Sequence, residues 1–158
     1  LQYFLSDKLK IIRVRPFNHI GPRQSPMFVV SAFAKRIVEI EKGHEKIMKV
    51  GNLHSKRDFT DVRDMVKAYL LAIEKGKEGD VYNIGSGVSY EISKILQMLL
   101  GLSSAQIKTE EDSSLMTSSD SPERTCDFSK FRSLTGWEPE IPIEKTLEDT
   151  LDYWRSKI

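Results

Sequence analysis

Features typical of secreted, membrane-spanning and nucleic-acid-binding proteins are scarce in this sequence of 158 residues. Its one cysteine, Cys126, cannot form an internal disulfide, so we expect a reducing compartment and a cytoplasmic location. Lys and Arg number 24 against 23 Asp and Glu, and the net charge of +1 lacks the basic excess of a dedicated nucleic-acid binder. No apolar run approaches the roughly 18–20 residues that a membrane span needs.

Signals for targeting and for metal binding are equally scarce. Asp7 and Lys8 end the first apolar stretch of the sequence, so we expect no signal peptide. His19, His44 and His54 have no metal-ligand spacing, and we expect no metal site. What the sequence does have is 39% hydrophobic and 30% charged residues, which predicts a packed core in one domain, or in one compact domain with an appendage.

Helix and strand patterns alternate along the chain, which predicts an α/β fold with parallel strands. Only residues 11–15 and 80–84 have the pattern of buried strands. A two-stranded parallel sheet is not stable alone, so these strands must pair with another chain or belong to a longer fold. Capping residues and apolar residues at helical spacing predict four longer helices, at about residues 25–43, 60–76, 89–100 and 142–154.

The helix at about residues 60–76 has the clearest pattern. Thr60 or Asp61 caps its start, and Gly76 ends it. Its apolar residues, which we expect to face the core along one side, are Val62, Met65, Val66, Tyr69, Leu70 and Ile73.

Four stretches of the sequence match, in order, the motifs of one known family. They are residues 15–22 (RPFNHIGP), 56–64 (KRDFTDVRD), 81–87 (VYNIGSG) and 127–130 (DFSK) running into 135–139 (TGWEP). With these stretches the chain resembles the extended short-chain dehydrogenase/reductases that modify nucleotide sugars. Residues 57–62 and 136–142 are most similar to the GDP-4-keto-6-deoxy-D-mannose reductases of that family, and the GDP-mannose 4,6-dehydratases come second.

Two motifs of the family are missing. The family binds NAD(P) on a Gly-rich loop, but no G-x-x-G-x-x-G occurs here, and residues 85–87 follow a strand without the third glycine. The family's proton donor is a Tyr with a Lys four residues later. Tyr90 with Lys94 and Tyr153 with Lys157 have this spacing, but both pairs come after the second strand, so we interpret them as coincidences.

The chain is therefore similar to the C-terminal half of such an enzyme. The resemblance implies that residues 1–24 and 53–87 close the Rossmann domain and its parallel sheet. It also implies that residues 25–52 and 88–158 form the smaller α/β substrate-binding domain. Because the missing motifs hold the cofactor and donate the proton, we expect this chain alone to retain no NAD(P) and to be inactive.

The resemblance also implies residues that bind the nucleotide sugar. Asn18 lies just past a strand end and matches an Asn that contacts the nucleotide sugar, although an Asn can also stabilise the turn there. Arg57 matches the Arg that holds the diphosphate, its alternative being a solvated surface residue. Val29 matches a position that packs on the purine. The family's further nucleotide-binding Arg aligns with Thr117, and Arg124 is the candidate substitute.

For the cofactor of the complete enzyme, the resemblance implies that Pro16 and Phe17 wall one side of the nicotinamide pocket. Arg23 lies on a loop from which it could reach cofactor or substrate. Two hypotheses stay open. In the first, the chain is the GDP-sugar-binding portion of an NAD(P)-dependent reductase or dehydratase, with a separate N-terminal half or a homo-oligomer as partner. In the second, it is a non-catalytic binding or interaction module that uses the same fold.

Overall fold

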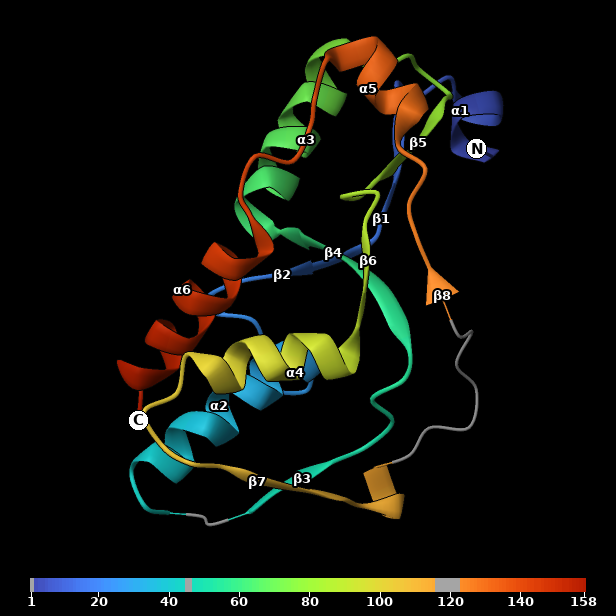
Figure 1. Cartoon of the computed structure of the whole chain (residues 1–158). Coiled ribbons are helices and arrows are strands. Elements are labelled where there is room, and N and C mark those ends of the chain that lie inside the picture. The colour runs from blue at the N-terminus through green and yellow to red at the C-terminus, as the bar shows by residue number, and fades with distance from the viewer. Residues whose placement is uncertain (1, 45–46, 116–122) are drawn as a thin grey trace.

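The computed structural model describes residues 2–44, 47–115 and 123–158, and Figure 1 shows their arrangement. The helices are α1 (Gln2–Asp7), α2 (Val29–Glu41), α3 (Val62–Lys75), α4 (Ile92–Gly101), α5 (Ser129–Thr135) and α6 (Ile143–Arg155), with a 3-10 turn at Ser113–Leu115. The strands are β1 (Arg13–Pro16), β2 (Asn18–Ile20), β3 (Ile47–Val50), β4 (Lys56–Asp61), β5 (Val81–Ile84), β6 (Ser89–Glu91), β7 (Lys108–Glu111) and β8 (Glu123–Arg124). None of the helices in the described ranges is long and apolar enough to cross a membrane.

The strands form three small groups, and most of their pairings are parallel. β1 pairs with β5 and β3 with β7, while β4 lies between β2 and β6 and also pairs with β8. Only the β4–β6 pairing is antiparallel among the described residues. The predicted α/β fold with parallel strands is therefore confirmed. The two segments predicted as the only buried strands correspond to β1 and β5, but β4 has more buried residues than either of them. The sequence did not indicate this because β4 carries a polar sequence, and β2, β6 and β8 are too short to give a pattern.

Two apolar clusters form the core on either side of the β2–β4–β6 group (Figure 1). The larger cluster joins α2, α4 and α6 to strands β3 and β4. The smaller cluster joins α3 and α5 across the β1–β5 pair, where the rings of Tyr82, Phe131 and Trp137 contact one another. Such tilted ring contacts stabilise the fold beyond the contribution of the buried apolar area.

Two predicted helix starts were wrong by a few residues. Ser25 and Pro26 form a turn before α2, in which the Ser25 hydroxyl accepts from the backbone N–H of Met27, and α2 begins at Val29. Ser89 belongs to β6, where it lies opposite Asp58 of β4. The local hydrogen bond of Ser25 and the strand pairing of Ser89 therefore keep these residues out of the helices that follow.

The predicted end residues of α3 agree with the structure, since Asp61 is its N-cap and Gly76 its C-cap. Asp61 caps α3, and its carboxylate accepts from the backbone N–H of Arg63 at 2.7 Å. Gly136 ends α5 in the left-handed conformation, with φ of 75°.

The side of α3 that faces the core differs from the prediction. Of the six residues predicted to face inward, only Met65 is fully buried, and the core contact is completed by Ala68 and Ala72. Val66, Leu70 and Ile73 are exposed. The helical spacing was read correctly, but the neighbouring elements cover only one part of a wide apolar surface.

One buried carboxylate connects β4 to two other segments. Asp58 is fully buried, and its oxygens accept hydrogen bonds from the backbone N–H groups of Ser86, Gly87 and Cys126 at 2.9–3.0 Å. The Ser86 hydroxyl donates a fourth bond, at 2.7 Å. Asp58 therefore fixes the turn after β5 and the segment after β8 to the strand that carries Arg57.

We expect Asp58→Asn to destabilise the chain by about 2–4 kcal/mol, because an amide cannot accept from all these buried donors. Urea unfolding followed by circular dichroism measures the change. Asp7→Asn, in the exposed helix α1, is the control and should change stability by less than about 0.5 kcal/mol. Equal stability of Asp58→Asn and the wild type would show that these hydrogen bonds do not contribute to the stability of the fold.

A second polar link holds α2 to α6. The Glu41 carboxylate accepts from Nε and Nη2 of Arg155 at 3.0 and 2.8 Å, and also from Ser103 and Ser104. The hydrogen bonds from Arg155 lower the pKa of Glu41 from 4.5 to about 2, although burial acts in the opposite direction.

Because the folded-state pKa of Glu41 is depressed, its ionised form contributes stability that is present above about pH 4.5 and is lost as the pH falls towards 2. We expect Glu41→Gln to cost about 1–3 kcal/mol at pH 7, with the difference from wild type shrinking across that range. Unfolding curves from pH 7 to 2 test this. Glu39→Gln, which removes only a surface pair with Lys35, is the matched control, and a pH-independent Glu41→Gln difference would contradict the assignment.

Candidate functional site

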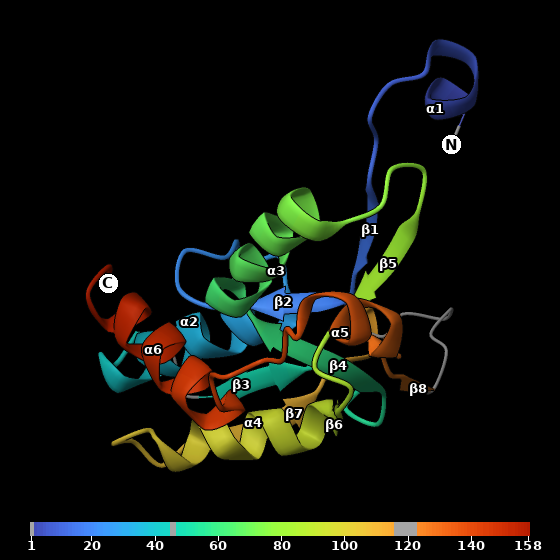
Figure 2. The same ribbon diagram turned by 90° about the horizontal axis from the view of Figure 1, so that it is seen from above.

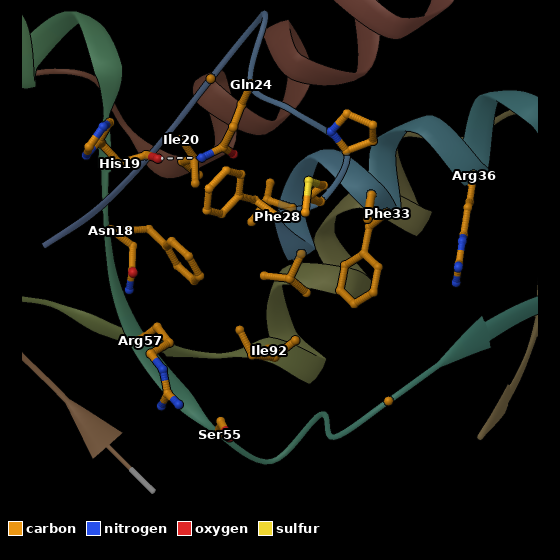
Figure 3. Close-up of a pocket in the computed structure, with 18 of the residues that line it drawn as sticks. Asn18, His19, Ile20, Gln24, Phe28, Phe33, Arg36, Ser55, Arg57 and Ile92 are labelled. Atoms are coloured by element: carbon orange, nitrogen blue, oxygen red, sulfur yellow. Dashed lines mark hydrogen bonds between the residues drawn. The ribbon is translucent and has the colours of Figure 1, made fainter. Parts of the chain in front are cut away.

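A cavity of about 1200 Å³ lies between β2, the segment 21–28, the first turns of α2 and the ends of β3 and β4. Figure 3 shows Asn18 and Arg57 at one end of the cavity and Arg36 at the other, with Phe28 and Phe33 between them. The cavity therefore has a polar, cationic end at Asn18 and Arg57, a further arginine at the opposite end, and an apolar wall between them. Such a lining suits a ligand with a charged group and a flat or apolar group.

Asn18 and Arg57 come to this end of the cavity from paired strands. Asn18 is opposite Phe59 in the parallel β2–β4 pairing, and its side-chain nitrogen donates to the Asp58 carbonyl at 3.3 Å. One Nη1 donor of Arg57 bonds to the carbonyl of its neighbour Lys56 at 2.8 Å. Both side chains line the cavity.

Arg124 lies beside Arg57 on the neighbouring strand. In the parallel β4–β8 pairing the two arginines are direct partners, so their side chains start from adjacent strands at the same level. Arg124 is exposed and is not among the residues that line the cavity. Two arginines at paired positions of adjacent strands favour an anion with several oxygens, such as a diphosphate.

The apolar wall comes from the segment before α2 and from its first turns. Val29, the predicted purine contact, lines the cavity and is partly exposed. Met27 and Phe28 also line it, and both are exposed, which is unusual for large apolar side chains. Phe33 is buried behind them. A planar base or another apolar group would cover this wall and remove it from water.

The sequence analysis did not assign Phe33 and Arg36 to a site. They follow Val29 by four and seven residues, so helical spacing from Val29 would have placed all three on one side of α2. Arg36 donates from Nη1 to the Lys49 carbonyl at 2.5 Å, which holds its guanidinium against β3.

The candidate cofactor residues line the same cavity. Pro16 ends β1, and Phe17, which connects β1 to β2, donates from its backbone N–H to the Ile84 carbonyl at 2.8 Å. Arg23, whose backbone φ is 71°, also lines the cavity, from the loop after β2. The packing also explains why the motif at residues 15–22 has a glycine at position 21. A Cβ there would lie only 2.8 Å from Cγ1 of Val62.

The turn after β5 is not available for a pyrophosphate. A dinucleotide loop needs backbone N–H groups that point at the phosphates. Here the N–H groups of Ser86 and Gly87 both donate to the Asp58 carboxylate. A Cβ at Gly85 would approach the Cβ of Cys126 to 2.5 Å, so this glycine serves close packing of the chain. This turn therefore does not fit the pyrophosphate of a dinucleotide.

The two Tyr/Lys pairs do not lie in the cavity. Tyr90 is on β6 while Lys94 is on α4, and burial raises the pKa of Tyr90, opposite to the shift that activates a proton donor. Lys157 lies against the ring of Tyr153 at 5.8 Å, at the end of α6. Neither tyrosine lines the cavity.

Cys126 is not among the residues that line the cavity. Burial, with the nearby carboxylates of Asp58 and Asp127, raises the pKa of the Cys126 thiol to about 12, so it stays protonated. Within the described ranges, no group of three or more His, Cys, Asp or Glu side chains could hold a metal ion.

Known proteins with similar sequences act on nucleotide sugars. A sequence model described as GDP-mannose 4,6 dehydratase matches residues 1–150. The GDP-6-deoxy-D-mannose reductase of Pseudomonas aeruginosa is 31% identical over 159 residues, which cover 100% of this chain and 52% of the relative. GDP-mannose 4,6 dehydratase 1 of Arabidopsis thaliana is 25% identical, over 86% of this chain and 38% of the relative.

Solved structures superpose on nearly the whole chain. The structure of RMD from Pseudomonas aeruginosa complexed with NADPH has a TM-score of 0.93 and 30% identity, over 99% of this chain and 52% of that one. The UDP-glucose 4-epimerase of Thermotoga maritima with UDP-glucose has a TM-score of 0.83 and 27% identity, over 99% of this chain and 49% of that one.

The chain spans about half the length of the curated relatives that it matches. The match nevertheless covers almost all of this chain, in sequence and in structure. The predicted resemblance is therefore confirmed: the chain belongs to the GDP-mannose 4,6-dehydratase family and corresponds to the C-terminal part of an extended short-chain dehydrogenase/reductase.

Proposed function

We propose that this chain is the GDP-sugar-binding portion of an NAD(P)-dependent nucleotide-sugar reductase or 4,6-dehydratase. The observation that supports this most is the cavity itself, which brings Asn18 and Arg57 to one end of an apolar wall. The names of the relatives, a GDP-6-deoxy-D-mannose reductase and a GDP-mannose 4,6 dehydratase, supply the substrate class.

In this proposal the three parts of a GDP-sugar occupy three parts of the cavity. Arg57 binds the diphosphate through charge-assisted hydrogen bonds, and Arg124 adds a second positive charge from β8. Asn18 contacts the nucleotide sugar, with its side chain held by the Asp58 carbonyl. The base packs on the wall that contains Val29.

We further propose that the chain binds its substrate but does not turn it over alone. Pro16 and Phe17 form one side of a nicotinamide pocket, and Arg23 lies beside it, but the other side belongs to residues outside this chain. The N–H groups after β5 that resemble a phosphate loop are already bonded to Asp58. When NAD(P) is bound in the complete enzyme, it supplies the hydride chemistry.

We propose the same division of the chain as the sequence motifs imply. Residues 1–24 and 53–87 complete a Rossmann domain, and residues 25–52 and 88–158 form the substrate domain. The lone, buried Cys126 agrees with a reducing, cytoplasmic environment.

Calorimetric titration of the pure chain with GDP-mannose, UDP-glucose and dTDP-glucose tests the proposal. We expect saturable binding that is tightest for the GDP-sugar, and we expect Arg57→Ala to weaken it about 10- to 100-fold by removing charged hydrogen bonds to the diphosphate. Arg57→Lys should restore only part of the affinity, because an ammonium cannot form two parallel bonds.

Arg132→Ala is the matched control, since Arg132 is an exposed arginine on α5 that pairs with Glu138. It should leave the affinity unchanged. An absence of binding to every nucleotide sugar would refute the proposed function, and unchanged affinity of Arg57→Ala would remove Arg57 from the site.

A further inference from the structure

Arg36 lies at the end of the cavity opposite Asn18 and Arg57 (Figure 3). It follows Val29 by two helical turns, so both residues lie on the same side of α2. Figures 1 and 2 show β3 beside α2, and the two elements contact each other. Nη1 of Arg36 donates to the carbonyl of Lys49 on β3 at 2.5 Å. This bond holds the guanidinium between the helix and the strand, at the margin of the cavity.

The bond from Nη1 leaves the other side of the Arg36 guanidinium, with its Nε and Nη2 donors, for a further partner. Among the described residues, neither of these two atoms forms a hydrogen bond. This chain already uses the same side of an arginine twice. Nε and Nη2 of Arg63 bind the two oxygens of Asp61 at 2.9 and 2.8 Å. Nε and Nη2 of Arg155 bind the Glu41 carboxylate at 3.0 and 2.8 Å. Arg36 therefore offers a flat pair of donors that matches two neighbouring acceptors in one plane.

The charged side chains that line the cavity favour acceptor groups on the ligand. Within the described ranges no aspartate or glutamate lines the cavity, and its charged lining residues are Arg23, Arg36, Lys49 and Arg57. A carboxylate is the side chain that accepts most strongly from the N–H groups of a base. At the Arg36 end, the charged groups can only donate, so they select a base by its acceptor atoms.

Guanine is the base whose acceptors match this pair of donors. Its O6 and N7 lie side by side on one edge, and an arginine binds both at once. Adenine has the N6 amino group, a donor, next to N7, and thymine has a methyl group next to O4. A guanidinium therefore forms two bonds with guanine and at most one with the other bases.

We propose that Arg36 selects guanine, by donating from Nε and Nη2 to O6 and N7 of the base. The inference rests on the proposed function, which places the diphosphate at Arg57 and the base on the wall that contains Val29. The seven residues from Val29 to Arg36 span about 10 Å along the helix axis. Because long helical side chains lean toward the helix N-terminus, this spacing brings Arg36 toward a base that packs on Val29.

Calorimetric titration of the pure chain with GDP, 7-deaza-GDP and UDP tests the inference. 7-Deaza-GDP has a C–H group in place of N7 and keeps O6 and the diphosphate. We expect the wild type to bind GDP about 10-fold more tightly than 7-deaza-GDP, because one of the two bonds is lost. Arg36→Ala should weaken GDP binding about 10- to 30-fold, bind GDP and 7-deaza-GDP equally, and bind UDP within about twofold of the wild type.

Two further variants complete the experiment. Arg36→Met keeps the length of the aliphatic stem and so its packing, and it should behave as Arg36→Ala does. Lys42→Ala is the control, since Lys42 is an exposed cation at the C-cap of the same helix and does not line the cavity. It should bind all three nucleotides as the wild type does.

Equal affinity of the wild type for GDP and 7-deaza-GDP, or a difference that persists in both Arg36 variants, would overturn the inference and leave the proposed function intact. Equal weakening of GDP and UDP binding by the Arg36 variants would assign Arg36 to general attraction of the diphosphate, and would overturn it too. If the wild type binds no nucleotide and no nucleotide sugar, the proposed function fails, and this inference fails with it.

Discussion

The Asp58 carboxylate is the interaction on which the candidate site depends. It is fully buried, and it accepts hydrogen bonds from the turn after β5 and from the segment after β8. The backbone carbonyl of the same residue accepts from Asn18. In this way one residue of β4 sets the positions of Asn18, of its neighbour Arg57 and of the strand that carries Arg124. A buried acceptor with this many donors permits one arrangement of these segments, since any other leaves N–H groups unpaired.

The same interaction also limits what the chain can do. The turn at Ser86 and Gly87 resembles the start of a phosphate-binding loop, but its N–H groups are bonded to Asp58 and cannot also hold a pyrophosphate. The network that orders the Asn18 and Arg57 end of the cavity therefore excludes a dinucleotide from this turn.

Much of the fold follows from local patterns in the sequence, which predicted the α/β class, the cap of α3 at Asp61 and its end at Gly76. Motif order identified the family, and the structure places Asn18, Val29 and Arg57 around one cavity. Long-range contacts could not be predicted from the sequence. Periodicity shows that α3 is apolar but not which side is covered, and no local signal links Asp58 to Cys126, which are 68 residues apart. The pairing of Arg57 with Arg124 depends equally on tertiary structure.

The central claim is that this chain can hold a sugar nucleotide but lacks the groups that reduce one. Incubating the pure chain with GDP-4-keto-6-deoxymannose and NADPH, and following the loss of NADPH absorbance together with formation of the reduced sugar, tests it most directly. The account predicts no turnover above the rate without protein. Steady conversion of the sugar with matching consumption of NADPH would contradict it.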